Sequence, residues 1–247
     1  MGRGAMHLAI ERAYDVFARY ARPAVLEASP VKNADAILRS LSLAPLRDLS
    51  EDKVGPYAGS ALYTVGNVQD YKHFLPRILE IAFAGSRGWV GCVPPAIANH
   101  LVYARWRDWP TKEVDAVRLA FQEGWTLARD QNPNGARNAS EWLCALSILE
   151  EPIDDLLDDW LDTPSVNAVL QLADFVGSAP TEMFGRIGDA AYWSSVDEGR
   201  RQKVASWMLT DPVAGALGFA RRAVGEEDLW SLDRALDVIR PRGRRPS

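Results

Sequence analysis

Apolar residues recur three and four positions apart along almost the whole chain, and this spacing limits the fold more than any other feature. The clearest run lies on one face of a helix and comprises Val114, Val117, Phe121, Trp125 and Ala128. The charged residues around it, Glu113 among them, are expected on the surface. Strict alternation of apolar and polar residues, which is typical of a strand, forms no convincing run. The sequence therefore predicts an all-α fold.

Prolines and glycines divide this pattern into about a dozen mostly short helices. Thr163-Pro164 and Asp211-Pro212 place a capping side chain before a proline, which is typical of a helix start. Breaks between helices are expected at Pro110-Thr111, Asn132 to Gly135, Gly177 with Pro180, and Gly225. Such helices pack as antiparallel neighbours, so we expect an irregular stack of helix hairpins. This stack is either a HEAT-like α-solenoid without a strict period or a multi-helix bundle.

Composition and charge indicate the broad class of protein. With 247 residues, 47% of them hydrophobic, the chain can bury a substantial core. Residues 1–239 are expected to form one helical domain, with residues 131–138 as the candidate lobe boundary and residues 240–247 as a flexible basic tail. The net charge of −5 argues against sequence-independent nucleic-acid binding. No apolar stretch is long enough to span a membrane, and two cysteines fit a reduced, cytoplasmic location.

The segment from Pro45 to Glu80 resembles a widespread family of bacterial cytoplasmic proteins that are all-helical and have no assigned activity. The resemblance rests on Pro45-Leu46-Arg47-Asp48-Leu49, Ala61-Leu62-Tyr63-Thr64-Val65-Gly66 and Asp70-Tyr71-Lys72-His73-Phe74-Leu75-Pro76-Arg77-Ile78-Leu79-Glu80. It continues through Trp106 to Pro110, Glu141 to Leu143, Ala191 to Trp193 and Ala205 to Pro212. Members of that family often have a close cysteine pair before the first segment, where this chain has Ala28 to Lys32. The resemblance implies no catalytic residue.

Asp70, His73, Arg77 and Glu80 are spaced three, four and three residues apart, so on a continuous helix they would form one polar stripe. Two carboxylates, an imidazole and a guanidinium could form an acid/base or anion-binding site. Pro76 disfavours helical geometry at Leu75, so a junction between two helices is also expected there. The alternative interpretation is an inter-helix network in which Arg77 bridges carboxylates and carbonyl groups.

The run Asp154-Asp155-Leu156-Leu157-Asp158-Asp159 matches the aspartate-rich pattern by which isoprenoid synthases hold magnesium. The adjacent apolar stripe favours a solvent-facing position for Asp154, Asp155 and Asp158 instead, and the second metal motif of such synthases is missing. No histidines or cysteines have the spacing of a zinc site. The sequence therefore indicates neither a metal nor a cofactor.

Trp106 and Trp109 lie near a predicted break, beside arginines. They could form an exposed interaction patch or stack within the fold. The resulting functional hypothesis is a module that binds another protein, for example an immunity or regulatory partner. The alternatives are a small-molecule binder or enzyme centred on Asp70, His73, Arg77 and Glu80, and a magnesium-dependent isoprenoid enzyme. Whether the chain is an enzyme stays open, and the sequence favours a binding role.

Overall fold

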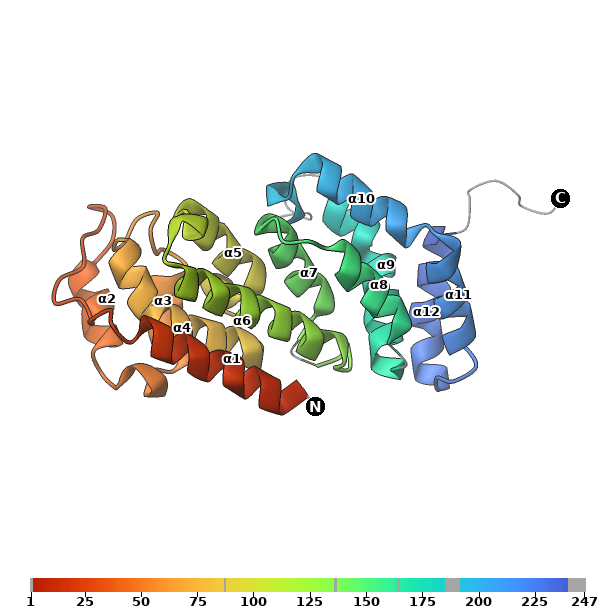
Figure 1. Ribbon diagram of the computed structural model, residues 1–247, viewed down its shortest axis with the longest axis horizontal. Coiled ribbons are helices and arrows are strands. Elements are labelled where there is room, and N and C mark those ends of the chain that lie inside the picture. The colour runs from red at the N-terminus through yellow and green to blue at the C-terminus, as the bar shows by residue number, and fades with distance from the viewer. Residues whose placement is uncertain (1, 87, 136, 164, 185–191, 240–247) are drawn as a thin grey trace. The chain divides into compact units, whose positions relative to one another are not determined.

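The structure is a computed structural model, shown in Figure 1, that describes residues 2–86, 88–135, 137–163, 165–184 and 192–239. Within these ranges the chain forms twelve α-helices and no β-strand, which confirms the predicted all-α class. The helices are α1 (Gly2–Phe17), α2 (Ala34–Leu41), α3 (Glu51–Ala58), α4 (Val68–Ala84), α5 (Pro94–Tyr103), α6 (Thr111–Arg129), α7 (Ala139–Ile148), α8 (Asp154–Asp162), α9 (Val166–Phe184), α10 (Glu198–Met208), α11 (Asp211–Ala220) and α12 (Glu226–Ile239). The 3-10 helices are η1 (Leu46–Asp48), η2 (Val90–Cys92), η3 (Trp106–Asp108) and η4 (Trp193–Ser195). A multi-helix bundle, one of the two expected arrangements, fits these helices.

The chain divides into two compact units, unit 1 at Met1–Leu127 and unit 2 at Ala128–Ser247. Unit 1 contains α1 to α5 and most of α6, and unit 2 contains α7 to α12. The candidate lobe boundary at residues 131–138 begins just after this division. The single domain over residues 1–239 stays a prediction, and the basic tail lies outside the described residues.

Helix α4 is the central helix of unit 1, since it packs against α1, α3 and α5. It begins with a capping box, in which Asn67 and Asp70 each accept a hydrogen bond from the other's backbone amide. The helix then continues through Pro76, so the expected junction at Leu75 is wrong. A proline inside a helix costs about 3 kcal/mol. Burial of Leu75, Pro76 and their apolar neighbours on this helix offsets that cost.

In unit 2, α9 packs most extensively against α12 and also contacts α7, α10 and α11. It runs through both Gly177 and Pro180, so the break expected there is wrong. Gly177 lies where α9 faces α12, and a Cβ there would make an ordinary van der Waals contact, at 3.5 Å, with the side chain of Arg234. Apolar residues of α9 between Ala168 and Val176 are buried, and this burial stabilises that part of the helix.

Other predicted helix limits agree with the structure to within a residue or two. Helix α6 begins at Thr111, and α12 begins directly after Gly225. Helix α11 begins at Asp211 as expected, although its N-cap is Thr210. Thr163 instead ends α8, where its hydroxyl donates to the carbonyl of Asp159, and Pro164 lies outside the described residues.

Among the described residues, no helix combines the length and the apolar character needed to cross a membrane.

Candidate functional site

The polar stripe predicted on α4 is present in sequence order, but the structure separates its members. Asp70 serves the helix start, where its carboxylate accepts the amide of Asn67 at 2.9 Å. Burial raises the pKa of Asp70, while that hydrogen bond lowers it. The carboxylate is therefore part of the helix cap.

Arg77 and Glu80 form an inter-helix network. The Arg77 guanidinium donates to the carbonyl of Leu49 at 2.7 Å and to the carboxylate of Glu80 at 2.6 Å. The hydroxyl of Tyr14, on α1, donates to the same carboxylate at 2.7 Å. Burial, and then the hydrogen bond to Glu80, raise the pKa of Tyr14. These contacts join α1 and the segment before α3 to α4, as the structural interpretation of Arg77 predicts.

His73 binds a third partner, because its Nδ1 lies 2.8 Å from the carbonyl oxygen of Tyr20. Burial lowers the pKa of His73, and the hydrogen bond to Tyr20 opposes this effect. The ring also lines a pocket of about 540 Å³ with Phe17 and Leu46. Asp70, Arg77 and Glu80 do not line that pocket, so the four side chains do not converge on one ligand.

Trp106 and Trp109 are both buried, so they do not form the exposed patch that the sequence suggested. The indole nitrogen of Trp109 donates to the carbonyl of Ala104 at 3.1 Å. Its ring packs edge-on against Phe17 and lies 4.1 Å from the ammonium of Lys72. Trp106 lies in η3, which contacts α5, and Trp109 follows this 3-10 helix directly.

Lys72 and Glu113 form a buried ion pair that sequence reasoning missed. Their side chains are 6% and 1% exposed, and their charged atoms lie 2.8 Å apart. The other carboxylate oxygen of Glu113 accepts from the hydroxyl of Tyr20 at 2.7 Å and from Arg19. The surface position expected for Glu113 is therefore wrong, because three donors from α4 and the end of α1 enclose its carboxylate. The position of Glu113 in the first turn after Pro110 was the available signal, since acidic residues are favoured there.

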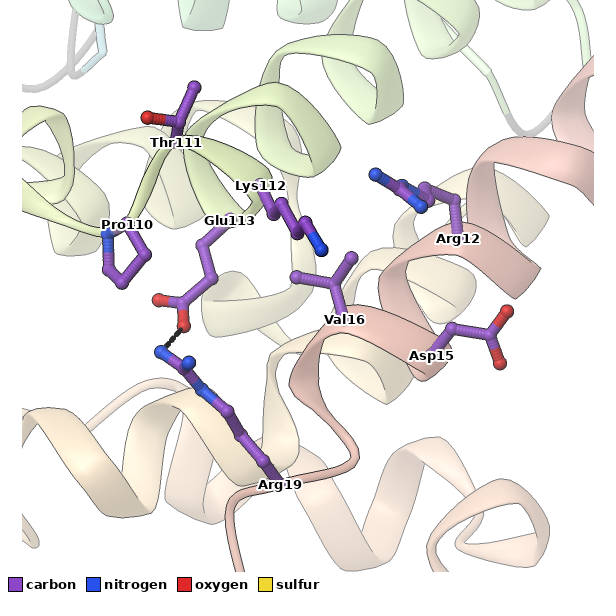
Figure 2. Close-up of a pocket in the computed structure, with 8 residues that line it drawn as sticks. All are labelled: Arg12, Asp15, Val16, Arg19, Pro110, Thr111, Lys112 and Glu113. Atoms are coloured by element: carbon purple, nitrogen blue, oxygen red, sulfur yellow. Dashed lines mark hydrogen bonds and ion pairs between the residues drawn. The ribbon is translucent and has the colours of Figure 1, made fainter.

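The outer side of this cluster is a surface pocket between α1 and α6, shown in Figure 2. The pocket has a volume of about 550 Å³. The residues that line it are Arg12, Asp15, Val16, Arg19, Pro110, Thr111, Lys112 and Glu113. Three cationic side chains thus face one cavity in a protein whose net charge is −5.

A second exposed feature of unit 1 is the tyrosine pair, by which we mean Tyr63 and Tyr103. Their ring centroids lie 5.0 Å apart in an edge-on contact, and the residues are 50% and 60% exposed. The ring of Tyr63 also lies 4.7 Å from that of His100, which is buried and stacks on Tyr71. The sequence placed Tyr63 in a family-like segment but provided no signal that Tyr103 would meet it.

The aspartate-rich helix α8 presents its acidic side chains to solvent, as the apolar stripe predicts, with Leu157 and Trp160 buried. Asp154 pairs with Lys203 at 2.6 Å, and Asp159 pairs with Arg129. Within the described residues, no group of three histidine, cysteine or acidic side chains could hold a metal ion.

No protein-family model, curated protein or solved structure matches the chain.

Proposed function

We propose that the chain is a protein-interaction module and that the tyrosine pair belongs to the surface that binds another protein. The observation behind this proposal is that two exposed tyrosine rings contact each other and that one of them packs against buried aromatic rings. Tyrosine is enriched at the energetic centres of protein interfaces, because a ring offers a large contact area and a hydroxyl at low conformational cost.

The backbone beside each tyrosine supports this proposal. Leu62, next to Tyr63, has a φ of 65°, and Arg105, two residues after Tyr103, has a φ of 53°. Residues other than glycine in this left-handed region are strained by about 1 kcal/mol or more. Such strain is concentrated at functional sites, where surrounding contacts hold the unfavourable conformation in place.

Hydrogen bonds hold the turn that displays Tyr63. The amide of Ser29 donates to the carbonyl of Thr64 at 2.8 Å, and the amide of Gly66 donates to the carbonyl of Glu27 at 2.7 Å. The residues that follow Tyr63 are therefore tied to the segment that contains Glu27 and Ser29. A preorganised aromatic group loses little entropy on binding, which favours affinity.

The test is affinity capture of the tagged chain from its native host, with the bound proteins identified by mass spectrometry. A variant with both Tyr63→Ser and Tyr103→Ser should lose the partner, because removal of one central aromatic side chain weakens binding by about thirtyfold. The matched control is Phe219→Ser, which removes an aromatic residue that is 75% exposed on α11. Circular dichroism should show that both variants keep their helical content.

Three results would contradict the proposal. One is the absence of any reproducible partner of the native chain. Another is undiminished capture by the double tyrosine variant. Equal loss of the partner in the double variant and in Phe219→Ser would show that the tyrosine pair has no special part in binding.

A further inference from the structure

The pocket between α1 and α6 contains more positive charge than its own ion pairs neutralise. Of its two acidic groups, Glu113 is already bound by Lys72, Tyr20 and Arg19. Asp15 points away from the other side chains that line the pocket, as Figure 2 shows. Neither carboxylate is therefore placed to neutralise the remaining cations.

Those remaining cations are Arg12 and Lys112. Figure 2 shows that they extend from α1 and α6 toward the same space near Val16. Among the described residues, neither has an ion-pair or hydrogen-bond partner. Two like charges that converge on one cavity repel each other, and an anion between them would convert this repulsion into attraction.

Arg19 is the third cation of the pocket. Its orientation is fixed by contacts with buried residues. Its guanidinium is bound to Glu113, whose position is set by Lys72 at 2.8 Å and Tyr20 at 2.7 Å. Glu113 is 1% exposed, whereas the Arg19 side chain is 56% exposed. A guanidinium has five N–H donors, so the edge of Arg19 that does not face Glu113 can donate to a ligand. The buried ion pair thus supports a cation at the surface.

We propose that this pocket binds the phosphate group of a small phosphorylated molecule. A phosphate monoester has close to two negative charges near neutral pH and three acceptor oxygens, which suits Arg12, Arg19 and Lys112 together. Thr111 also lines the pocket. The cavity of about 550 Å³ has room for a carbon skeleton, which would lie against Val16 and Pro110.

This proposal does not depend on the tyrosine pair, because neither Tyr63 nor Tyr103 lines the pocket. Substitutions at Arg12 and Lys112 therefore test the pocket alone, and substitutions of the tyrosines test the interaction surface alone.

The experiment is isothermal titration calorimetry of the full chain with inorganic phosphate and with glycerol 3-phosphate, at constant ionic strength. Glycerol, which lacks the phosphate group of glycerol 3-phosphate, is the uncharged control ligand. We expect saturable binding of both anions at one site, with competition between them and no binding of glycerol. Arg12→Gln and Lys112→Gln should each weaken binding by at least about tenfold, because each removes a charge-assisted hydrogen bond.

The matched control is Arg39→Gln, which removes one positive charge from an exposed position on α2 in the same unit. It should leave binding unchanged. Equal weakening in all three variants would overturn the proposal, because it would show a general charge effect. Failure of both anions to bind saturably would overturn it as well. Arg12-dependent binding to vesicles that contain phosphatidic acid, without binding of glycerol 3-phosphate, would also overturn it in favour of a lipid headgroup.

Discussion

The carboxylate of Glu113 on α6 lies 2.8 Å from the ammonium of Lys72 on α4, and both side chains are almost completely buried. Removal of one partner leaves the other charge buried and unpaired, which typically costs about 3–5 kcal/mol. We therefore expect Glu113→Ala to lower the free energy of unfolding by about that amount, measured by urea denaturation.

Arg19 also binds Glu113, but its side chain is 56% exposed. Arg19→Ala should therefore cost less than about 1 kcal/mol, as is usual for pairs that include an exposed charge. Similar losses of stability in Arg19→Ala and Glu113→Ala would show that burial of the Lys72 pair is not the source of the effect.

We expect Arg77 to stabilise the fold, because its guanidinium donates hydrogen bonds to the carbonyl of Leu49 and to the carboxylate of Glu80. Arg77→Ala would leave both acceptors without this donor and should destabilise unit 1 by about 2 kcal/mol. Glu80→Gln keeps an acceptor for Arg77 and should cost less. Chemical denaturation of both variants measures this difference. Unchanged stability in Arg77→Ala would contradict the interpretation that Arg77 stabilises the fold through an inter-helix network.

Gly91 is a position where even one methyl group does not fit. A Cβ there would lie 2.1 Å from the backbone nitrogen of Gly59, and backbone cannot move aside as a flexible side chain can. Gly91→Ala should therefore destabilise the protein by about 3 kcal/mol. Gly218→Ala is the control, because its Cβ would meet no atom within 4 Å and the position is helical. This variant should be more stable than the native chain by up to about 1 kcal/mol in thermal or urea unfolding.

The strain at Arg105 predicts a gain in stability. Its φ of 53° suits glycine, and within the described part of the chain its side chain forms only a surface ion pair with Asp108. Arg105→Gly should stabilise the protein by about 0.5–1 kcal/mol through relief of strain. Arg105→Ala removes the same ion pair but keeps a Cβ, so it should give no gain. A higher melting temperature for the alanine variant than for the glycine variant would contradict this explanation.

His100 should make stability depend on pH. Burial lowers the pKa of His100 below the ordinary value of 6.5, although its hydrogen bond to the carbonyl of Ala96 opposes the shift. Between pH 7.5 and 5.5 the unfolded chain therefore takes up a proton more readily than the folded chain does. The full stability is present above pH 6.5 and decreases as the pH falls toward the lowered pKa.

The measurement is urea denaturation of the native chain and of His100→Asn at both pH values. The native chain should lose more stability on acidification than the variant does. His73, whose pKa is also lowered by burial, should maintain part of the pH dependence in the variant. Identical pH dependence in the two proteins would exclude His100 as a source.

Periodicity predicted much of the secondary structure because each helix must bury one face whatever its neighbour is. The stripe from Val114 to Ala128 is one example, since α6 covers these residues and all of its members except the half-buried Val114 are buried. The same argument placed the aspartates of α8 toward solvent. It was wrong at Leu75, where buried neighbours hold α4 together across Pro76, and at Gly177 with Pro180, where α9 continues across both residues.

The candidate site was less predictable for a related reason. Helical spacing brought Asp70, His73, Arg77 and Glu80 to one side of α4 but could not show that each has a different partner. Those partners are supplied by residues distant in sequence, such as Tyr20 and Leu49.

The sequence by itself determined the all-α class, the approximate positions of most helices and the solvent-facing side of α8. These properties follow from local propensity and from the period of the apolar residues. Only the tertiary structure decided that Glu113 is buried against Lys72, that Tyr63 meets Tyr103, and that Arg12 and Lys112 face one pocket. Each of these relationships joins residues from different elements, and their distances depend on how helices pack, which no local pattern records.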